Sequence, residues 1–446
     1  MSKDKQLVIV GAGLVGSLLA CYLGRRGYAV DLYERRPDPR SAAVERGRSI
    51  NLALSERGLD ALRRIDLVDT VMAPALPMHG RMIHGLDSTT TFQSYSANGD
   101  RAINSISRSA LNETLLDAAE ATPGVTLHFN ARLASYDLDS NTLTFESAGV
   151  VESRAADVVL ATDGFGSIVR QELQSRGRVS VVTDALDFGY KELTIPPKDG
   201  EFAMDPDALH IWPRGASMMI ALPNPDRTFT CTLFWPKTGD EGFDALETEQ
   251  QILDHFNRVY PDAVPLMPTL VEDYQYNPVG LLATIHSDPW QADGKVALVG
   301  DAAHAILPFF GQGAMCGFED VVELDRCLSE VGDDWTLALP MYQERRRHNA
   351  EAIAQLAKEN FVEMRDKVGS KTFLATKKLE HALEKLLPGT YLSRYEMVSF
   401  TTIPYAEVVE RSKKQQQILA VAAGGAVLAV AAGATALLRR ITGAED

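Results

Sequence analysis

The stretch LVIVGAGLVG, residues 7–16, decides the fold. Its β-forming apolar residues run directly into a glycine-rich turn, and an apolar helical pattern continues from there to Arg26. In a dinucleotide-binding strand–turn–helix unit, Gly11 permits the tight turn, Gly13 lets the backbone approach a pyrophosphate, and Gly16 lets the helix pack closely on the strand. The helix also points its positive N-terminal end at the anion. This stretch therefore predicts a nucleotide-binding α/β domain.

A second strand, AVDLYE at residues 29–34, follows the helix and ends at Glu34. Its carboxylate comes at the distance along the chain at which such folds place an acceptor for the hydroxyls of a ribose. A GxGxxG pattern alone is weak evidence, but strand, glycine turn, helix, second strand and terminal acid occur here in order. The combination predicts a Rossmann-type domain without separating FAD from NAD as the ligand.

Two later segments favour a flavin. DVVLATDG, residues 157–164, is expected to be a strand that delivers Asp163 to a turn, and KVALVGDAAH, residues 295–304, a strand that ends near Asp301. A carboxylate at such a strand end can hydrogen-bond to the ribityl hydroxyls of FAD. The following helix would direct its positive end at the flavin edge where charge accumulates on reduction. Each segment alone is compatible with an ordinary turn, but together with the first motif they indicate FAD.

Size and composition limit the other possibilities. The 446 residues are too many for one ordinary core and suggest two or three domains. A formal net charge of −16 disfavours nucleic acid as a partner. The four cysteines form no CxxC or zinc-ligand pair and lie in apolar stretches, so we expect buried, unpaired thiols and no metal site.

The C-terminal residues 418–438 read ILAVAAGGAVLAVAAGATALL, a run of 21 residues without a charge. A helix of about 20 apolar residues spans a bilayer, and basic residues flank this run on both sides. We therefore expect a transmembrane tail anchor that holds a cytoplasmic catalytic domain at a membrane. The alternative is a buried, alanine-rich helix. The sequence does not predict the oligomeric state.

The order of these motifs resembles that of the single-component flavoprotein aromatic hydroxylases. The resemblance covers GxGxxG, an internal Asp163-Gly164 and a late Gly300-Asp301 followed by PFFGQG at residues 308–313. It implies FAD held by the first motif, Asp163 near the pyrophosphate and Asp301 on the ribityl chain. It also implies NAD(P)H as reductant without a second Rossmann domain, and the sequence contains no second GxGxxG. NADPH is the expected reductant, although the sequence does not separate it from NADH.

Other stretches are similar to the kynurenine 3-monooxygenase family within this class. The stretches RSINLALSERG (48–58) and ALHIWPRG (208–215) are specific to that family, and ENFVEM (359–364) and RYEMVSF (394–400) continue the resemblance. This resemblance implies hydroxylation of L-kynurenine with O2 as the oxygen source. Three alternatives stay open: hydroxylation of another aromatic substrate, a flavin reductase or epoxidase acting on membrane lipid, and a membrane-tethered binding module without catalysis.

The resemblance to the kynurenine 3-monooxygenase family also implies a substrate pocket. Arg81 matches an arginine that pairs with the amino-acid carboxylate of the substrate, and Tyr95 matches a tyrosine that contacts the same group. Asn360 and Tyr395 match the residues that complete the pocket. The chemistry agrees, because the planar fork of an arginine binds a carboxylate through two hydrogen bonds. The apolar neighbours of Arg81 in the sequence also suggest that its side chain points inward.

The remaining matches concern the flavin. Arg108 matches a flavin-contacting arginine, and Phe309 and Phe310 match residues over the ring pocket. Gly311, Gln312 and Gly313 are expected to bind the cofactor at the start of a helix. After this motif the relatives usually have an asparagine where this chain has Met315, a change expected to alter the flavin potential or its coupling.

The resemblance further implies a mechanism without a catalytic acid or base. The amine of an aniline already donates its lone pair to the ring, so we expect catalysis by positioning and exclusion of water. His304, beside the second acidic motif, is expected to be a structural neighbour of the cofactor. The charged run from Glu344 to His348 is expected to be the solvated face of a helix.

The expected architecture is α/β: a Rossmann-type FAD-binding domain interleaved with an antiparallel-sheet substrate domain, then C-terminal helices and a transmembrane helix. The expected boundaries follow. The FAD-binding domain takes residues 1–77, 105–180 and 285–339, the substrate domain takes the hairpin 78–104 and residues 181–284, the helices take 340–410 and the anchor takes 418–438.

Overall fold

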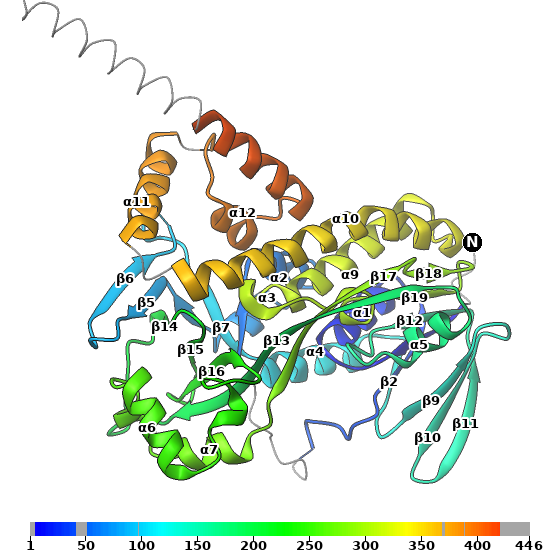
Figure 1. Ribbon diagram of the computed structural model, residues 1–446. Coiled ribbons are helices and arrows are strands. Elements are labelled where there is room, and N and C mark those ends of the chain that lie inside the picture. The colour runs from blue at the N-terminus through cyan, green and yellow to red at the C-terminus, as the bar shows by residue number, and fades with distance from the viewer. Residues whose placement is uncertain (1–4, 42–50, 97, 368–370, 388, 420–446) are drawn as a thin grey trace, which may run out of the picture.

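The computed structural model describes residues 5–41, 51–96, 98–367, 371–387 and 389–419. Two β-sheets lie beside one another, and the long helix α10 (Trp335–Val362) runs across both of them (Figure 1). A mainly parallel sheet with helices on its faces carries the N-terminal glycine motif. A larger sheet forms the second half of the molecule, with two helices on its outer side (Figure 1).

The first sheet is the expected Rossmann-type sheet and has six strands in the order β18-β19-β12-β1-β2-β8. All neighbours are parallel except β18 and β19. The strands are β1 (Gln6–Val10), β2 (Ala29–Tyr33), β8 (Val125–His128), β12 (Val158–Ala161), β18 (Gln291–Ala292) and β19 (Val296–Leu298). They come from three distant parts of the chain, so the domain is discontinuous.

The short apolar strands follow from the burial of both faces of this sheet. Leu7, Val8 and Ile9 of β1 are all buried, as expected for a central strand covered on both faces by helices. The covering helices include α1 (Leu14–Arg25), α4 (Arg108–Ala121) and α9 (Gly313–Glu330). The strand and helix predicted from residues 7–26 are thereby confirmed.

The second sheet has seven strands in the order β17-β13-β16-β15-β14-β5-β6. These strands are β5 (Gly80–His84), β6 (Thr90–Ser94), β13 (Ser180–Ile195), β14 (Ala208–Pro213), β15 (Met218–Pro223), β16 (Phe229–Pro236) and β17 (Gly280–Asp288). A purely antiparallel sheet was expected, but β5 and β14 pair in parallel. A parallel pair needs a long crossover. The chain between these two strands, which contributes to the FAD-binding half, provides that crossover.

The two faces of this sheet have different neighbours. The outer face packs a core that includes Trp212, Trp235 and Phe256 under α6 (Glu249–Val259) and α7 (Leu270–Tyr276). The inner face carries other apolar residues, such as Ile211 and Phe234, and is turned toward the first sheet. Because side chains alternate along a strand, one set of strands serves the outer core and the inner face at once.

Smaller elements complete the fold. One three-stranded sheet contains β3 (Asn51–Leu54), β7 (Ile103–Ser107) and β4 (Leu76–Met78), so the chain around the predicted hairpin contributes to two sheets. Another contains β9 (Arg132–Asp137), β10 (Thr142–Ser147) and β11 (Val150–Ala155). The short helices are α2 (Glu56–Arg63), α3 (Val68–Met72), α5 (Ile168–Ser175) and α8 (Asp301–His304). All four cysteines are buried and unpaired, as expected.

The C-terminal part is helical where it is described. After α10 come a π-helical turn (Glu363–Lys367), α11 (Lys371–Leu386), α12 (Arg394–Phe400) and helical residues 405–419. Within the described parts of the chain, none of the helices has both the length and the apolar character to cross a membrane. The transmembrane helix predicted for residues 418–438 lies outside the described residues except for its first two positions.

Candidate active site

A cavity of about 480 Å³ lies between the two sheets. Strand ends and turns of the Rossmann-type half contribute Gly13, Thr162 and Asp301 to its wall. The inner face of the seven-stranded sheet contributes mainly apolar side chains, together with two charged ones, Arg81 on β5 near one end and Glu192 on β13. Tyr395 of α12 also lines the cavity. The Rossmann-type half, the seven-stranded sheet and the C-terminal helices therefore all contribute to its wall.

The glycine turn at the start of α1 shows three different constraints. Gly11 has a φ of +99°, which favours glycine. A Cβ at Gly16 would lie 1.9 Å from the Gly11 carbonyl oxygen, so only glycine allows the helix to approach the strand. A Cβ at Gly13 would meet no atom within 4 Å, although Gly13 lines the cavity. Gly13 therefore leaves space on the cavity side of the turn, as close approach of a pyrophosphate requires.

Glu34 follows β2 and is buried beneath this turn. Its Oε2 accepts a hydrogen bond from the Ala12 backbone N–H at 3.0 Å. Its Oε1 accepts from the backbone N–H of Arg36 at 3.1 Å and from the Arg36 Nε at 2.8 Å. These bonds fix the carboxylate at the strand end, beside the helix N-terminus, where a ribose acceptor was expected.

The two later acidic motifs end neighbouring strands of the same sheet, β12 and β19. Asp163 Oδ2 accepts from the Ile168 backbone N–H at 2.8 Å, whereas its buried Oδ1 has no hydrogen-bond partner among the described residues. Burial raises the pKa of Asp163. Asp301 begins α8 and lines the cavity; burial raises the pKa of its carboxyl group as well, against the opposing effect of His304 and Arg108.

The turn before α9 closes the cavity from the Rossmann-type side. Phe309, Phe310, Gly311 and Gly313 all line the cavity, and Gly311 has a left-handed φ of +65°. Gln312 lies behind them, 1% exposed, and its amide donates to the carbonyl oxygen of Phe310 at 3.4 Å. The first turn of α9 thus faces the cavity with its backbone, an arrangement that attracts negative charge.

Arg81, Tyr95 and Tyr395 come together at one end of the cavity, as expected. The Arg81 guanidinium carbon lies 5.8 Å from the centre of the Tyr95 ring and 5.0 Å from that of Tyr395. The two rings stack with their centroids 4.9 Å apart. Arg81 is only 6% exposed, and its Nε has no hydrogen-bond partner among the described residues. A buried donor without an acceptor is costly, so this end of the cavity is suited to an anionic ligand group.

The protonation states in this pocket favour the same ligand. Burial works against the charge of Arg81, but Tyr395, Tyr95 and Glu363 raise its pKa above the ordinary value, so the guanidinium stays charged. Burial also raises the pKa of Tyr95 and, further, that of Tyr395. Both phenols therefore remain protonated at neutral pH and available as donors.

Two expected flavin or substrate neighbours are placed differently. Asn360 is not among the described residues that line the cavity; its Nδ2 donates to the Phe309 carbonyl oxygen at 2.7 Å. This bond makes Asn360 a support for the turn, one step behind the cavity wall. Met315 is fully buried in the main core, and a Cβ at Gly58 would lie 2.3 Å from its sulfur. Its side chain fills the contact between α9 and α2.

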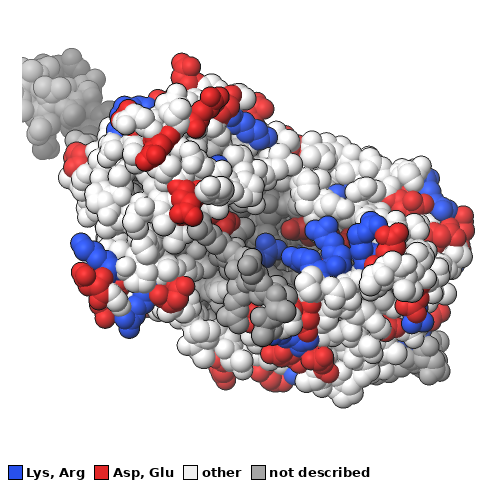
Figure 2. Space-filling model, turned by 90° about the horizontal axis from the view of Figure 1, so that it is seen from below, with Lys and Arg blue, Asp and Glu red and all other residues white. Residues whose placement is uncertain are grey.

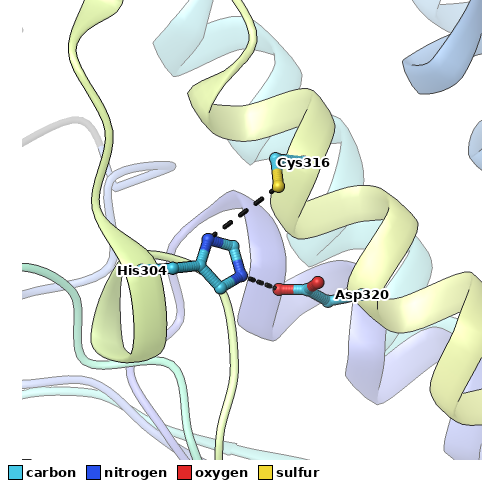
Figure 3. A group of neighbouring side chains, drawn as sticks. All are labelled: His304, Cys316 and Asp320. Atoms are coloured by element: carbon cyan, nitrogen blue, oxygen red, sulfur yellow. Dashed lines mark hydrogen bonds and ion pairs between the residues drawn. The ribbon is translucent and has the colours of Figure 1, made fainter. Parts of the chain in front are cut away.

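His304 belongs to a buried polar cluster next to the cavity (Figure 3). Its Nε2 lies 2.5 Å from Asp320 Oδ2, and its Nδ1 lies 3.8 Å from the Cys316 sulfur. Burial works against protonation of His304, but Asp320 raises its pKa well above the ordinary value. Arg346 Nε donates to the other Asp320 oxygen at 2.7 Å, and its Nη2 lies 3.2 Å from the Cys316 sulfur. The Arg346 charge disfavours a cation within this group.

Arg346 also corrects an expectation about the charged run from Glu344 to His348. The run does lie on a helix, α10, but Arg346 is 5% exposed and forms ion pairs with Glu319 and Asp320 of α9. The middle of the run thus faces the protein interior, because the opposite helix supplies carboxylates that compensate the buried charge.

The cavity also contains polar residues that were not predicted from the sequence. Tyr190 and Glu192 of β13 and Thr230 and Thr232 of β16 all line it. The alternation of residues along each strand could have indicated them, because two residues that are two positions apart on a strand point to the same face of the sheet. Lys191, between the first two, is accordingly buried among residues of the outer side, with its charge over the Tyr274 ring at 4.4 Å.

Basic side chains gather along one side of a hollow on the molecular face shown in Figure 2, whereas acidic side chains are spread around it. This local concentration contrasts with the formal net charge of −16 for the whole chain. A basic hollow raises the local concentration of anions, which suits phosphate-bearing ligands.

These features fit FAD. Gly13 leaves open space at a helix N-terminus, Glu34 is fixed at the end of β2, and the Asp163 Oδ1 is a buried acceptor without a partner among the described residues. Asp301 and the first turn of α9 add an acidic group and backbone N–H groups farther along the same wall. We regard these residues, with Arg108 at the start of α4, as the candidates that hold the cofactor.

Comparison with known proteins agrees with this geometry. Residues 4–357 match the family model described as FAD binding domain. Among solved structures, 2-methyl-3-hydroxypyridine-5-carboxylic acid oxygenase has a TM-score of 0.67 at 23% identity, covering 84% of this chain and 96% of that one. The p-nitrophenol 4-monooxygenase of Pseudomonas putida has a TM-score of 0.66 at 19% identity, covering 86% and 94%. The chain belongs to the FAD-dependent monooxygenases.

Relatives that are more similar in sequence than these solved structures identify the family within this class. Kynurenine 3-monooxygenase of Myxococcus xanthus is 46% identical over 407 residues, covering 91% of this chain and 88% of the relative. That of Dictyostelium discoideum is 44% identical, covering 93% and 92%, and that of Salinispora tropica is 43% identical, covering 98% and 97%. The chain is therefore a member of the kynurenine 3-monooxygenase family.

Proposed function

We propose that the protein hydroxylates L-kynurenine at the 3-position of its aromatic ring, with NADPH as reductant and O2 as the oxygen source. The observation that carries the substrate assignment is the buried guanidinium of Arg81 between two tyrosines at one end of an otherwise mainly apolar cavity. An amino-acid substrate with an aromatic ring has the complementary shape. Its carboxylate would meet Arg81, and its ring would lie along the apolar wall toward the flavin side.

The protein's own contribution to the reaction is to position the substrate and to exclude water from the reacting centre. FAD, when bound, supplies the redox chemistry that uses NADPH and O2. Arg81, with Tyr95 and Tyr395, would anchor the amino-acid end of the substrate and so fix the distance of the ring from the cofactor. Phe309, Phe310 and the aliphatic side chains of the cavity would keep water away from the reacting centre. The ring amine of kynurenine activates the neighbouring carbon, so this reaction needs no protein base.

The direct test is NADPH oxidation by the purified, FAD-loaded protein with different candidate substrates. We expect L-kynurenine to accelerate NADPH and O2 consumption, whereas 4-hydroxybenzoate and dispersed phospholipid leave the rate at its basal value. Acceleration by 4-hydroxybenzoate alone would assign another aromatic substrate. Acceleration by phospholipid alone would indicate lipid chemistry, and no acceleration by L-kynurenine with FAD still bound would contradict the proposal.

We further propose that residues 418–438 anchor the protein to a membrane. The support is the sequence alone: 21 residues without charge, preceded by Lys413 and Lys414 and followed by Arg439 and Arg440.

Co-sedimentation with phospholipid vesicles tests the anchor. The full-length chain is expected to sediment with the vesicles, and a chain ending at residue 417 is expected to stay in the supernatant with unchanged kinetics toward L-kynurenine. Leu428→Arg is the matched control in the full-length chain, because a central arginine costs about 2.5–3.5 kcal/mol for insertion. Equal sedimentation of all three proteins would contradict the anchor.

A further inference from the structure

The short helix α12 carries Tyr395 into the cavity. It has seven residues, from Arg394 to Phe400, and begins at Ser393, whose hydroxyl accepts a hydrogen bond from the Glu396 N–H. Isolated helices of this length are not stable in water, because too few hydrogen bonds compensate for the cost of nucleation. The position of Tyr395 therefore depends on the tertiary contacts that hold α12.

Arg57, which lies on α2, donates hydrogen bonds to backbone carbonyl oxygens at the end of α12. Arg57 Nε donates to the Val398 carbonyl oxygen at 3.0 Å. Its Nη2 donates to the Met397 carbonyl oxygen at 3.4 Å, which also accepts from the Thr401 hydroxyl at 2.6 Å. The same Nη2 donates to the Ile403 carbonyl oxygen, in the segment after α12, at 2.5 Å. The last carbonyls of a helix have no donor within the helix, and a basic side chain can supply one. Arg57 thus caps α12 from a helix more than three hundred residues away in the sequence.

Arg57 is itself rigidly held. It is 1% exposed, and its guanidinium carbon lies 3.8 Å from the centre of the Tyr405 ring. Its Nη1 pairs with Glu319 of α9, and the other Glu319 oxygen pairs with Arg346 at 3.0 Å. Because Arg346 also pairs with Glu319, loss of Arg57 would not leave this carboxylate alone in the interior.

Tyr405, which packs on Arg57, connects it to the flavin side of the cavity. The Tyr405 hydroxyl donates to Gln312 Oε1 at 2.8 Å, and the Gln312 amide donates to Ser55 Oγ at 3.3 Å. Gln312 immediately precedes α9, whose first turn faces the cavity. Arg57 therefore lies at the point where the C-terminal segment, α2 and the cofactor-side turn meet.

We propose that Arg57 is a positioning residue for substrate binding: by capping α12, it holds Tyr395 stacked on Tyr95 and beside Arg81. The substrate part of this inference rests on the proposed function. Arg57 is not among the described residues that line the cavity, so it acts through α12.

The test replaces Arg57 with methionine, which keeps an unbranched, apolar stem and removes the guanidinium that forms the cap. Hydrogen–deuterium exchange of the peptide covering residues 394–400 is expected to become at least about tenfold faster, because the Val398 carbonyl loses the Arg57 donor and the segment after α12 loses the bond at Ile403. The dissociation constant of L-kynurenine, read from the absorption spectrum of the bound FAD, is expected to rise about tenfold. FAD content is expected to remain at the wild-type level.

Arg214→Met is the matched control. Arg214 is partly buried and likewise donates to backbone carbonyls, that of Val259 at the end of α6 at 2.6 Å and that of His84 at the end of β5 at 2.9 Å. It should change neither the exchange of residues 394–400 nor the L-kynurenine affinity. In a Tyr395→Ala background, Arg57→Met should weaken L-kynurenine binding by less than about twofold, because the residue through which it acts is already lost.

Several outcomes would overturn the inference. Unchanged exchange of residues 394–400 in Arg57→Met contradicts the capping role, whatever the substrate is. Faster exchange with unchanged L-kynurenine affinity contradicts the link to binding. If the wild-type protein shows no response to L-kynurenine, the proposed function and the substrate part of the inference fail together, while the exchange data still decide the cap. If Arg57→Met does not fold, Arg57→Lys, which cannot reach three carbonyls at once, is judged by the same criteria.

Discussion

Replacing Arg81 with methionine is expected to raise the KM for L-kynurenine by about 100-fold or more, with FAD still bound. The guanidinium is buried, charged and has an unpaired Nε–H within the described structure, so its hydrogen bonds to a substrate carboxylate form without competition from bulk water. Hydrogen bonds to charged groups contribute about 1.5–3 kcal/mol each, and the loss of a pair of them corresponds to at least two orders of magnitude in affinity. Steady-state kinetics of NADPH oxidation measure the change.

Two controls assign this effect to the carboxylate. Arg81→Lys keeps the charge but loses the planar fork, so its KM should lie between those of the wild-type and methionine proteins. A kynurenine analogue that lacks the carboxylate should bind the wild-type and Arg81→Met proteins with equal, weak affinity. If the analogue binds the wild-type protein as tightly as L-kynurenine does, Arg81 does not recognise the carboxylate.

Gly13→Ala is expected to weaken FAD binding by about 100-fold or more, about 2.7 kcal/mol, without disturbing the fold. Gly13 has φ −76° and ψ −174°, which any residue adopts, and an added Cβ would meet no protein atom within 4 Å. The methyl group would instead occupy the space through which a pyrophosphate approaches the helix N-terminus. Fluorescence titration of the cofactor-free protein with FAD measures the affinity, and the thermal midpoint of that protein reports on the fold.

Gly16→Ala provides the contrast. Its Cβ would lie 1.9 Å from the Gly11 carbonyl oxygen and 2.5 Å from Thr162 Oγ1, so it should lower the thermal midpoint even without FAD. Wild-type FAD affinity in Gly13→Ala would show that the cofactor does not approach this turn. An equal loss of thermal stability in both cofactor-free variants would show that Gly13 is needed for packing rather than for the ligand.

The parts of the fold that local sequence encodes were predictable. The glycine turn and Glu34 depend on residues close together in the chain, and their spacing reflects local geometry. β12, β19 and α9 were predictable for the same reason, because short apolar runs and a glycine turn mark their ends. Arg81 was also expected to face inward, which its burial confirms.

Other features depend on contacts that local sequence does not encode. The parallel pairing of β5 with β14 is set by the crossover of a whole intervening segment. Arg346 resembled a solvated residue because its partners, Glu319 and Asp320, lie on another helix. Asn360 likewise gave no local sign that its amide supports the Phe309 carbonyl. For Arg346 and Asn360 a polar group is buried by tertiary structure, and its partner is distant in the chain.

The proposed reaction places one oxygen atom of O2 in the aromatic ring of L-kynurenine. The most direct measurement is the mass of the product formed by the FAD-loaded protein with NADPH and L-kynurenine under isotopically labelled O2. We expect a ring-hydroxylated product that carries one labelled oxygen, and an unlabelled product when the label is in water instead. NADPH consumption that yields only hydrogen peroxide and unmodified L-kynurenine would contradict it.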